Sequence, residues 1–576
     1  MGDPRILFEG NLAALRDREL AARLAAQRPD FSAPVSYRFL EARNGDPVPA
    51  LYGAEGRSAG PARPLHSLFD PRREGERLIA ALEGEDFLVF LGLGGAYQVE
   101  AALARSETDW AVIVEFGLRG FAELLGLRDL RGILADDRVR LLVDPRPGVL
   151  ERLIPDLYLP VLSKALRVLP LRPRVEGGEF AGAAEEVRRA LGRISADYSV
   201  QAHFGIRMFK NTLRNILRAE GEAAPLPRIR RAAVCAAGPS LDSQIPRLAE
   251  ARRQGEAPFL IATDTSLPAL LCGALEPDAV ISIDCQHISY RHFIPPGVRR
   301  CSRESCGIPP ASRLFLDLAS PPPLASLAAR PVFFSAGHPL GAYISSRWRP
   351  FPQIDGSGGN VTYAAVSLAE ALGAAEIELY GADFSYPQGR TYARGTYLFP
   401  YFDTLQNRFE PLEALFSRFL YRSPLEKRIL PREPDCAESA GSWYYETETL
   451  VHYRESLEAA GERMRARLIP ADGLGAPIVC RPRRDGESPA AAPCRTAAVP
   501  PVREFLAAYR EKIRALPPPA GTAAGLYLAG LGDEGRRILS TLLPLAAALR
   551  QKEPGTDLIE RTRSYSIAAI DRVLGV

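Results

Sequence analysis

Short apolar runs alternate with helix-length amphipathic segments in two separate stretches of this 576-residue chain. In the first stretch the apolar runs fall at 87–91, 111–114 and 139–143, and helical spacing at 96–103 and 121–125 separates them. Strands divided by helices are typical of βαβ units, in which the chain crosses over a sheet before adding the next parallel strand. The alternation therefore predicts an α/β fold with a doubly wound sheet.

The second stretch repeats this pattern after a connector helix that we predict over residues 204–218. Predicted strands lie at 232–236, 258–262, 279–283, 314–317, 332–335 and 376–380, with helices at 241–251, 267–271 and 361–372. We expect a second Rossmann-like sheet here. Ser357 precedes the last of these helices, and it is expected to cap the free N–H groups of its first turn.

Strand signals disappear past about residue 440. We predict one long helix over 445–468, a linker rich in Pro, Gly and Ala over 481–500, and helical stretches over 501–515, 523–550 and 556–574. The predicted domains are an N-terminal extension (1–64), a first Rossmann-like domain (65–205), a central domain (206–437) and a helical C-terminal domain (438–576).

Composition excludes several classes of protein. The net charge of +3 provides no bulk attraction to nucleic acid. Residues 1–5 include an acid and a proline where a signal peptide is basic, and no apolar run approaches the ~20 residues of a membrane span. The eight cysteines, of which Cys301 and Cys306 lie closest together, lack zinc spacing. We therefore expect a cytoplasmic protein without a membrane span or a metal.

A first glycine loop, Gly92 to Gly95, follows the predicted strand at 87–91 and precedes a helix. Glu115 ends the next strand, where a Rossmann domain places the acid that binds ribose hydroxyls. However, Tyr97 stands in the place of the third glycine of that motif. A nucleotide-binding loop and a turn packed for tightness alone both remain open.

A second glycine loop follows the strand at 232–236. Glycine admits close backbone approach, and the N-terminus of the next helix attracts phosphate. Two further strands end in acids that are expected at the same sheet edge, where parallel sheets bind ligands. The predicted nucleotide-binding residues of this pocket are Gly238, Pro239, Ser240, Asp264, Asp284 and Gln286.

A third glycine loop and a tyrosine loop complete the predicted site. Ser357, Gly358 and Gly359 precede the helix at 361–372 and are expected to present backbone N–H groups to a phosphate. Tyr386 and Tyr392 follow the strand at 376–380, and two phenols in one loop suit donation to a leaving phosphate; ordinary aromatic packing is the alternative. The sequence has no GxxxxGK[ST] or HExxH motif, which argues against a P-loop kinase and a zinc protease.

In this order the motifs resemble the motility accessory factor family, which shares its central domain with archaeal 6-hydroxymethylpterin diphosphokinase-like proteins. The resemblance spans most of residues 65–480. It rests on segments 235–241, 261–264, 277–284, 358–386 and 449–454, and upstream on His66, Ser67, Asp70, Pro71, the loop at 92–97, Asn211 and Asn215.

The resemblance implies a glycosyltransferase that moves a nonulosonic acid, pseudaminic or legionaminic, from a CMP-activated donor to Ser or Thr hydroxyls of flagellin, in support of flagellar assembly and motility. In similar sialyltransferases a Gly-Asn-Gly-Pro-Ser loop holds the nucleotide; here residues 238–240 match it, and Ala237 replaces the Asn. The tyrosine loop assigns catalytic roles to Asp383, Tyr386 and Tyr392. Because CMP is already a good leaving group, no cofactor is required.

The resemblance leaves the catalytic base open, because no histidine lies between Tyr392 and His452. Asp284, Asp383 and His287 are the candidates. The helical C-terminal region is expected to dock flagellin. Two alternatives are a Mg-dependent 6-hydroxymethyl-dihydropterin diphosphokinase and a non-catalytic flagellin-binding chaperone on the same fold.

Overall fold

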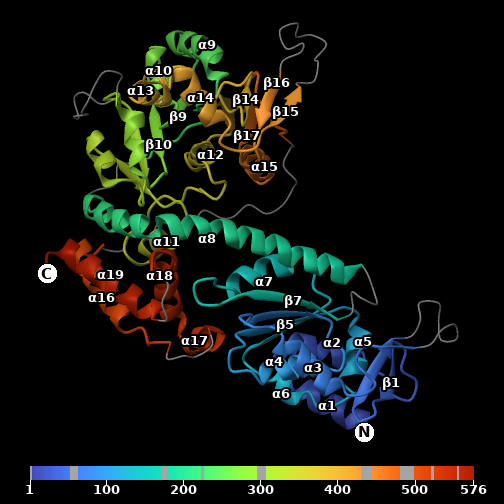
Figure 1. The fold of residues 1–576 in the computed structure, drawn as a ribbon. Coiled ribbons are helices and arrows are strands. Elements are labelled where there is room, and N and C mark those ends of the chain that lie inside the picture. Colours follow the sequence, from blue (N-terminus) through green and yellow to red (C-terminus); the bar gives the residue numbers. More distant parts are fainter. Residues whose placement is uncertain are drawn as a thin grey trace. The chain divides into compact units, whose positions relative to one another are not determined.

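The computed structural model describes residues 3–51, 62–171, 178–221, 226–294, 307–429, 443–480, 499–519, 524–553 and 557–576. The chain divides into two compact units (Figure 1). The first unit holds residues 1–203, 515–539 and 543–562, and the second holds 204–514, 540–542 and 563–576. The boundary between His203 and Phe204 falls inside the 40-residue helix α8 (Glu179–Arg218).

The first unit contains a four-stranded parallel sheet in the order β6-β5-β4-β7. Its strands are β4 (Phe87–Leu91), β5 (Trp110–Glu115), β6 (Val139–Val143) and β7 (Leu166–Pro170). Helices α3 (Pro71–Ala80), α4 (Tyr97–Leu103), α5 (Leu118–Leu124), α6 (Arg131–Leu134) and α7 (Val149–Leu157) connect or precede them. The sequence predicts β4, β5 and β6 but not β7, because this edge strand is only partly buried and carries the exposed Arg167.

Residues 1–64, predicted as an extension, are part of the first unit. They form α1 (Pro4–Ala14), α2 (Arg18–Ala26) and a three-stranded antiparallel sheet of β1 (Tyr37–Glu41), β2 (Pro47–Leu51) and β3 (Arg63–Pro64). Phe8, Leu24 and Tyr37 are buried in the same apolar cluster as Leu88 of β4. The N-terminal segment therefore completes this core.

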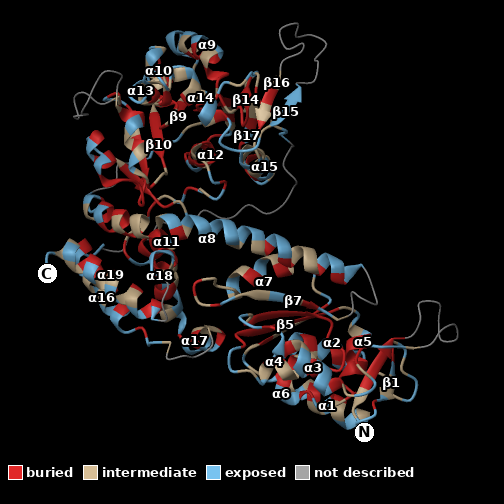
Figure 2. Cartoon of the chain, viewed as in Figure 1, coloured by how far each residue is buried: buried red, intermediate tan, exposed pale blue. Residues whose placement is uncertain are grey.

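The second unit contains a seven-stranded parallel sheet in the order β12-β11-β10-β9-β8-β13-β17. Its strands are β8 (Arg231–Cys235), β9 (Phe259–Thr263), β10 (Ala279–Ser282), β11 (Arg313–Asp317), β12 (Val332–Phe334), β13 (Glu376–Tyr380) and β17 (Arg467–Pro470). Figure 2 shows β9 and β10 largely buried, like β5 of the first unit. Two Rossmann-like sheets are thus confirmed.

Helices of the second unit include α9 (Leu241–Gln254), α10 (Leu267–Cys272), η2 (His287–Phe293), η3 (Pro322–Leu327), α11 (Pro339–Arg347) and α12 (Val361–Ala371). The cap of α12 is Asn360, whose Oδ1 accepts from the N–H of Tyr363 at 3.0 Å. The predicted cap, Ser357, is wrong, because Gly358, Gly359 and Asn360 separate it from the first helical residue, and only the residue next to the helix reaches its free N–H groups.

The predicted single helix over 445–468 is also wrong. The chain forms strand β16 (Trp443–Glu446), helix α15 (Glu448–Gly461) and strand β17, which pairs with β13 in the large sheet. Thr447 starts α15 as its cap, with Oγ1 accepting from the N–H of Leu450 at 3.2 Å. Strands therefore continue past residue 440, and the central sheet draws its last strand from the segment predicted to be helical.

A small sheet and a helical hairpin follow β13. The sheet has the order β14-β16-β15, with β14 (Tyr386–Pro387) and β15 (Glu426–Ile429) flanking β16. The hairpin consists of α13 (Leu398–Asp403) and α14 (Leu412–Leu420), which pack on each other (Figure 1). Phe402 and Leu415 are buried between them.

The C-terminal segment is helical, as predicted. Its helices are α16 (Val502–Arg514), α17 (Ala524–Gly530), α18 (Asp533–Lys552) and α19 (Leu558–Leu574). The helix predicted over 523–550 is interrupted between Gly530 and Asp533. Most of the predicted linker, 481–498, lies outside the described residues, as do Cys301 and Cys306. In the described part of the chain, every helix is too short or too polar to cross a bilayer.

Candidate active site

A cavity of about 370 Å³ lies at the carboxyl edge of the seven-stranded sheet, as the described residues form it. Its walls include residues 236–238 after β8, 381–386 after β13 and 360–362 at the start of α12. Strands β8 and β13 are the neighbours between which the strand order reverses. Open α/β sheets bind their ligands at this kind of switch point, so topology alone makes this cavity a candidate site.

The glycine loop after β8 closes tightly on the loop after β13. The N–H of Gly238 donates to the carbonyl of Gly381 at 2.8 Å. A Cβ atom at Gly238 would lie 2.4 Å from Oδ2 of Asp383 and 2.5 Å from that carbonyl oxygen. Any larger residue would therefore separate the two loops, which explains why glycine occupies position 238.

Asp383 lines the cavity and also fastens the glycine loop. Its Oδ2 accepts from the N–H of Ser240 at 2.8 Å, while Oγ of Ser240 accepts from the N–H of Leu474 at 2.9 Å. Burial raises the pKa of the Asp383 carboxyl, and its hydrogen bonds with Ser240 oppose that rise. Ser240 and Pro239 are buried and lie outside the lining formed by the described residues. These contacts are structural, and the catalytic role of Asp383 stays a prediction.

Both predicted tyrosines line the cavity. Tyr386 is part of β14 and pairs through its backbone with Tyr445, whereas Tyr392 packs against the α13–α14 hairpin, 6.2 Å from the ring of Phe419. Burial raises the pKa of Tyr392, and nearby Tyr397 raises it further. A phenol in this state keeps its proton at neutral pH and is a hydrogen-bond donor.

The predicted acids end their strands at the expected sheet edge but bond to neighbouring groups. Oδ2 of Asp264 accepts from the hydroxyl of Ser282 at 2.6 Å, and its Oδ1 accepts from the N–H of Thr265 at 2.7 Å. Asp284 accepts from the backbone N–H of Gln286 at 2.9 Å and from its side-chain amide at 3.4 Å. Thr265 lines the cavity, whereas Asp264, Asp284 and Gln286 lie outside the lining formed by the described residues. Nucleotide binding by the acids and by Gln286 stays a prediction.

The third glycine loop turns tightly around a tyrosine. A Cβ atom at Gly358 would lie 2.2 Å from the ring of Tyr363, and Gly359 has a φ of +73°. The N–H of Ser357 donates to Oδ1 of Asp355 at 2.8 Å. Residues 360–362, one step further on, line the cavity instead of 357–359. They are the cap and the first two residues of α12, at the positive end of the helix dipole.

Arg422 is a lining residue for which the sequence contains no signal. Its guanidinium lies 4.0 Å from the centre of the Phe419 ring, and no ion pair of this arginine occurs among the described residues. Its positive charge counteracts the upward shift in the pKa of Tyr392. Remaining polar lining residues are mostly hydroxyls: Thr263, Thr265, Thr362, Ser385, Thr391, Ser423, Thr447 and Thr449. Tyr453, from the segment 449–454 of the resemblance, also lines the cavity.

His292 is outside the cavity lining formed by the described residues but interacts with the charges of Asp264 and Asp284, and the sequence marks it no more than the other histidines. It is buried in η2, and its ring meets Tyr397 edge-on at 4.4 Å. Its Nδ1 has no hydrogen-bond partner within the described ranges. Burial lowers the pKa of His292, while Asp264 and Asp284 raise it less. A neutral imidazole is the form that accepts a proton, so His292 joins the candidates for the base; His287 is exposed.

The first glycine loop, by contrast, is filled by the protein's own side chains. The N–H of Gly95 donates to Nε2 of His66 at 2.7 Å, and the N–H of Leu93 donates to Oε2 of Glu115 at 2.8 Å. A Cβ atom at Gly94 would lie 2.5 Å from His66 and 2.5 Å from Leu171. Of the two interpretations that the sequence left open, the contacts favour a turn packed for tightness.

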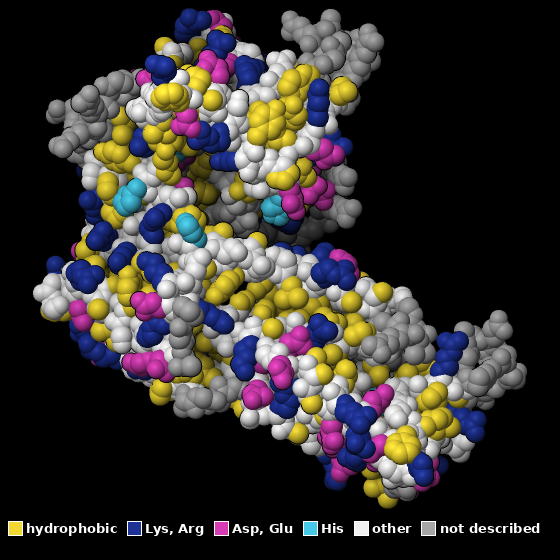
Figure 3. Space-filling model, viewed as in Figure 1, with side chains coloured by type: hydrophobic (Ala, Val, Ile, Leu, Met, Phe, Trp, Pro, Cys, Tyr) yellow, Lys and Arg dark blue, Asp and Glu magenta, His cyan; other side chains and the backbone are white. Residues whose placement is uncertain are grey.

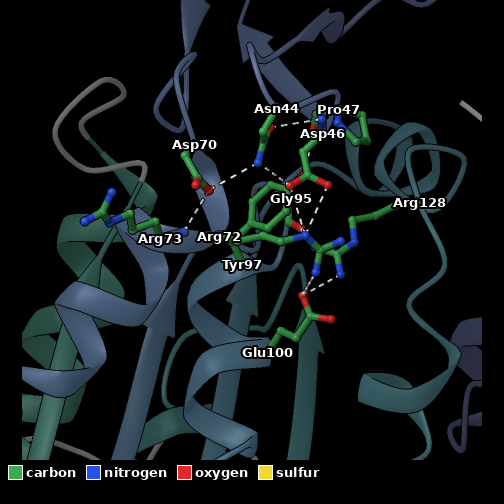
Figure 4. Close-up of polar contacts among 10 residues, drawn as sticks. All are labelled: Asn44, Asp46, Pro47, Asp70, Arg72, Arg73, Gly95, Tyr97, Glu100 and Arg128. Atoms are coloured by element: carbon green, nitrogen blue, oxygen red, sulfur yellow. Dashed lines mark hydrogen bonds and ion pairs between the residues drawn. The ribbon is translucent and has the colours of Figure 1, made fainter.

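Figure 4 shows the polar network that holds this loop in place. The hydroxyl of Tyr97 donates to the carbonyl of Pro47 at 2.7 Å, and burial raises its pKa to about 12. The guanidinium groups of Arg128 and Arg72 lie 4.6 Å and 5.7 Å from the centre of the Tyr97 ring. Arg128 also donates to the carbonyl of Gly95 at 3.3 Å. Tyr97 thus fastens the loop to β2.

Asn211 and Asn215, both on α8, have a structural role. The side-chain amide of Asn211 donates to the carbonyls of Cys285 and Ala319 at 3.2 and 2.9 Å. The amide of Asn215 donates to the carbonyls of Leu318 and Ser320 at 2.9 and 2.8 Å. These bonds hold the segments after β10 and β11 against α8.

Charge is distributed without one dominant sign on the face drawn in Figure 3, where Lys and Arg side chains are interspersed with Asp and Glu. This distribution agrees with the small net charge of +3. No cluster of three or more His, Cys, Asp or Glu suited to a metal ion occurs in the residues that the structure describes. Among the described residues that line the cavity, Arg422 and the N-terminus of α12 contribute positive charge.

Comparison with known proteins identifies relatives of parts of the chain. Residues 208–389 match the family model described as 6-hydroxymethylpterin diphosphokinase MptE-like. An uncharacterized protein of Treponema pallidum (strain Nichols) is 35% identical over 127 residues, 22% of this chain and 42% of that protein. A second one is 33% identical over 172 residues, 29% of this chain and 80% of that protein. The chain thus spans less than half the length of the first relative.

The whole chain is similar in structure to the MAf glycosyltransferase from Magnetospirillum magneticum AMB-1. The TM-score is 0.59 at 14% sequence identity, and the match covers 99% of this chain and 95% of that one. The chain therefore has the fold of this glycosyltransferase from end to end. Together with the MptE-like match, this confirms the predicted resemblance to the motility accessory factors.

Proposed function

We propose that this chain, which belongs to the same family as the second Treponema protein and has the fold of a glycosyltransferase, transfers a nonulosonic acid from a CMP-activated donor to Ser or Thr hydroxyls of flagellin in the cytoplasm. The observation that carries the proposal is the cavity at the β8–β13 switch point, whose walls combine the Gly238 loop, Tyr386, Tyr392 and Arg422. The identities of donor and acceptor follow from the family resemblance.

The chemistry of the cavity suits such a donor. A CMP-nonulosonate carries a phosphodiester and a carboxylate, and arginine and a helix N-terminus both bind anions. Arg422 and residues 360–362 supply these two features from separate segments of the second unit. The lining hydroxyls suit sugar hydroxyls, and Phe384 and Tyr453 offer aromatic faces for a base.

In the proposed reaction the bond between the anomeric carbon and the phosphate oxygen breaks, and its electron pair leaves with CMP. Tyr386 and Tyr392 donate hydrogen bonds to the phosphate as negative charge develops there, which stabilises the transition state. The acceptor hydroxyl oxygen forms the new bond to the anomeric carbon. Its proton passes to a base, for which Asp383 in the cavity lining, Asp284 and His292 are the candidates.

A second candidate, pyrophosphate transfer from ATP to a pterin alcohol, is favoured by the MptE-like match over residues 208–389. This reaction predicts Mg²⁺ dependence, and carboxylates are the usual protein ligands of Mg²⁺. Among the described residues that line the cavity, Asp383 provides the one carboxylate, and it already accepts from the N–H of Ser240. A third candidate is a flagellin-binding chaperone, which predicts no nucleotide binding.

The test is to incubate purified protein with CMP-nonulosonate and flagellin and to measure the intact mass of flagellin. The expected result is a gain equal to whole nonulosonate residues. No gain, with a donor proven on another transferase, would contradict the proposal. Calorimetry separates the candidates, because binding of CMP supports the transferase, binding of ATP with Mg²⁺ supports the kinase, and binding of neither supports the chaperone.

A further inference from the structure

A second cavity of about 340 Å³ shares a wall with the proposed donor cavity. Thr391, Tyr392 and Leu420 line both of them. Tyr392, to which we assign contact with the leaving phosphate, therefore separates two hollows. A transferase needs a second binding place next to its donor, since the acceptor oxygen must reach the anomeric carbon.

The floor of the second cavity is aromatic. Phe399 and Phe416 line it, and their ring centres lie 4.9 Å apart with the planes tilted by 52°. Both side chains are half-buried, and the hairpin that carries them is packed around the buried Phe402 and Leu415. A hollow with a fixed apolar floor favours an apolar side chain of a partner.

The rim of the second cavity carries excess positive charge. Arg390 and Arg394 both line it, and they share the carboxylate of Asp242 at 3.5 Å and 4.0 Å. Their side chains are 42% and 86% exposed. Two guanidinium groups on one carboxylate leave a positive charge in excess, so the rim attracts a negatively charged group.

The same hairpin exposes apolar side chains between its helices. Phe409 is 86% exposed and Leu405 is 45% exposed, and both belong to the segment that joins α13 to α14. They belong to the same hairpin as Phe399 and Phe416 of the second cavity. Exposed apolar side chains that gather on one segment are common on surfaces that contact another protein.

We infer that the second cavity is the acceptor subsite, which binds an extended polypeptide segment. An apolar side chain of this segment lies on Phe399 and Phe416, and an acidic side chain lies at Arg390 and Arg394. A hydroxyl of the segment beside these two side chains then reaches the wall formed by Tyr392. The inference rests on the proposed function, and it names the chemistry of the acceptor segment rather than the protein that contains it.

The experiment measures peptide affinity by fluorescence anisotropy on the full-length protein, with and without saturating CMP. Three labelled serine peptides serve as probes: one with an acidic and an apolar neighbour, one with lysine for the acid, and one with glycine for the apolar residue. Arg394→Glu is the test variant, and Arg418→Glu is its control. Arg418 is on α14, its side chain is 64% exposed, and it does not line either cavity within the described residues.

The wild-type protein is expected to bind the acidic, apolar peptide at least about tenfold more tightly than the other two. Arg394→Glu is expected to abolish or reverse the preference for acid over lysine, while CMP affinity stays within about twofold and Arg418→Glu leaves both unchanged. An unchanged preference in Arg394→Glu, or no peptide binding at all, overturns the inference. A large loss of CMP affinity in that variant also overturns it, because the second cavity would then belong to the donor site.

Failure of the proposed function gives a different result. If CMP does not bind the wild-type protein, the transferase proposal fails, and the peptide measurements without CMP still decide whether the second cavity is a polypeptide site. If CMP binds and the peptides do not, the donor site stands and the acceptor subsite is rejected.

Discussion

The two glycine loops of this molecule start from the same topology and reach opposite outcomes. Each follows the first strand of a parallel sheet, β4 or β8, beside the strand where the order reverses, β7 or β13. At β4, atoms of His66 and Leu171 lie 2.5 Å from the place of a Cβ of Gly94, and His66 also accepts from the N–H of Gly95. At β8 the loop packs just as tightly, with Asp383 and the carbonyl of Gly381 within 2.5 Å of a Cβ of Gly238, but it borders a cavity of about 370 Å³.

The topology of a switch point supplies a position for a ligand, while side chains from elsewhere in the chain determine whether that position is open. Both loops use a carboxylate to hold a backbone N–H: Glu115 accepts from Leu93, and Asp383 accepts from Ser240. A carboxylate near a glycine loop is therefore not by itself a sign of a ribose or phosphate site. What distinguishes the second loop is the open space beside it and the donors that face this space.

The largest effect that we expect from a change at the open loop is on turnover. Tyr392→Phe removes a donor to the leaving phosphate, so kcat for transfer to flagellin is expected to fall about 100-fold with little change in the melting temperature. Tyr421→Phe is the control, because Tyr421 is 63% exposed and lies outside the lining formed by the described residues. Full activity of Tyr392→Phe, measured by single-turnover kinetics, would remove its assigned role.

Arg422→Gln is expected to weaken binding of the anionic donor about tenfold or more, because a hydrogen bond to a charged group contributes about 1.5–3 kcal/mol. Calorimetric titration with CMP and with a free nonulosonic acid shows whether the phosphate or the carboxylate depends on this residue. Arg408→Gln is the matched control, since its guanidinium lies 5.6 Å from the ring of Phe409 and does not line the cavity. Equal affinity in both variants would contradict the role of Arg422.

The closed loop is tested by removing the side chain that fills it. His66→Ala leaves the N–H of Gly95 without its acceptor in a buried place, and we expect the free energy of unfolding to fall by about 2 kcal/mol. CMP affinity is expected to stay unchanged. Denaturant unfolding and calorimetry measure the two quantities. A loss of CMP affinity with intact folding would mean that the first loop takes part in donor binding, and the contrast between the loops would not hold.

The smallest effect is expected for Asp383→Asn. Burial raises the pKa of this carboxyl in the folded protein, so the folded state binds the proton more tightly than the unfolded state does. The resulting stabilisation is present at pH values below the unfolded pKa and is lost as the pH rises through the folded pKa. Asparagine keeps an oxygen for the N–H of Ser240 and carries no charge.

The melting temperature of Asp383→Asn relative to the wild type is therefore expected to be higher at pH 8 than at pH 4, and scanning calorimetry at the two values measures the difference. Transfer activity is expected to stay within about tenfold if the carboxylate only positions the Gly238 loop. A loss of activity of several hundredfold at unchanged stability would restore the catalytic role that the family resemblance assigns to Asp383.

Much of the fold can be predicted from the sequence, because the strands that lie inside the two sheets are short, continuous apolar runs. Strands β4, β8 and β10 are buried throughout or nearly so, and most of their residues are correspondingly apolar. The edge strands β7 and β17 are less buried. Both β7 and β17 have exposed arginines and pair on one side only, so their assignment depends on the neighbouring strand.

The candidate site was predictable in part. Gly238, Asp383, Tyr386 and Tyr392 line one cavity, as expected for loops that leave neighbouring parallel strands. The helix start that faces the cavity is 360–362 rather than 357–359, a shift that follows from the cap at Asn360. No motif indicates Arg422 or His292, because one arginine or histidine far along the chain has no local pattern that sets it apart.

Local sequence patterns predict most strands of the two parallel sheets and the places of their glycine loops, since strand burial and backbone turns depend on residues close together in the chain. Contacts between distant residues decide which of the two loops borders a cavity. His66 precedes Gly95 by 29 residues and fills one crevice, and Arg422 follows the Gly238 loop by a far longer stretch and faces the other. The free energy of such contacts depends on which distant side chains lie together at the sheet edge. A local sequence pattern does not predict this, because it involves only residues that are near one another in the chain.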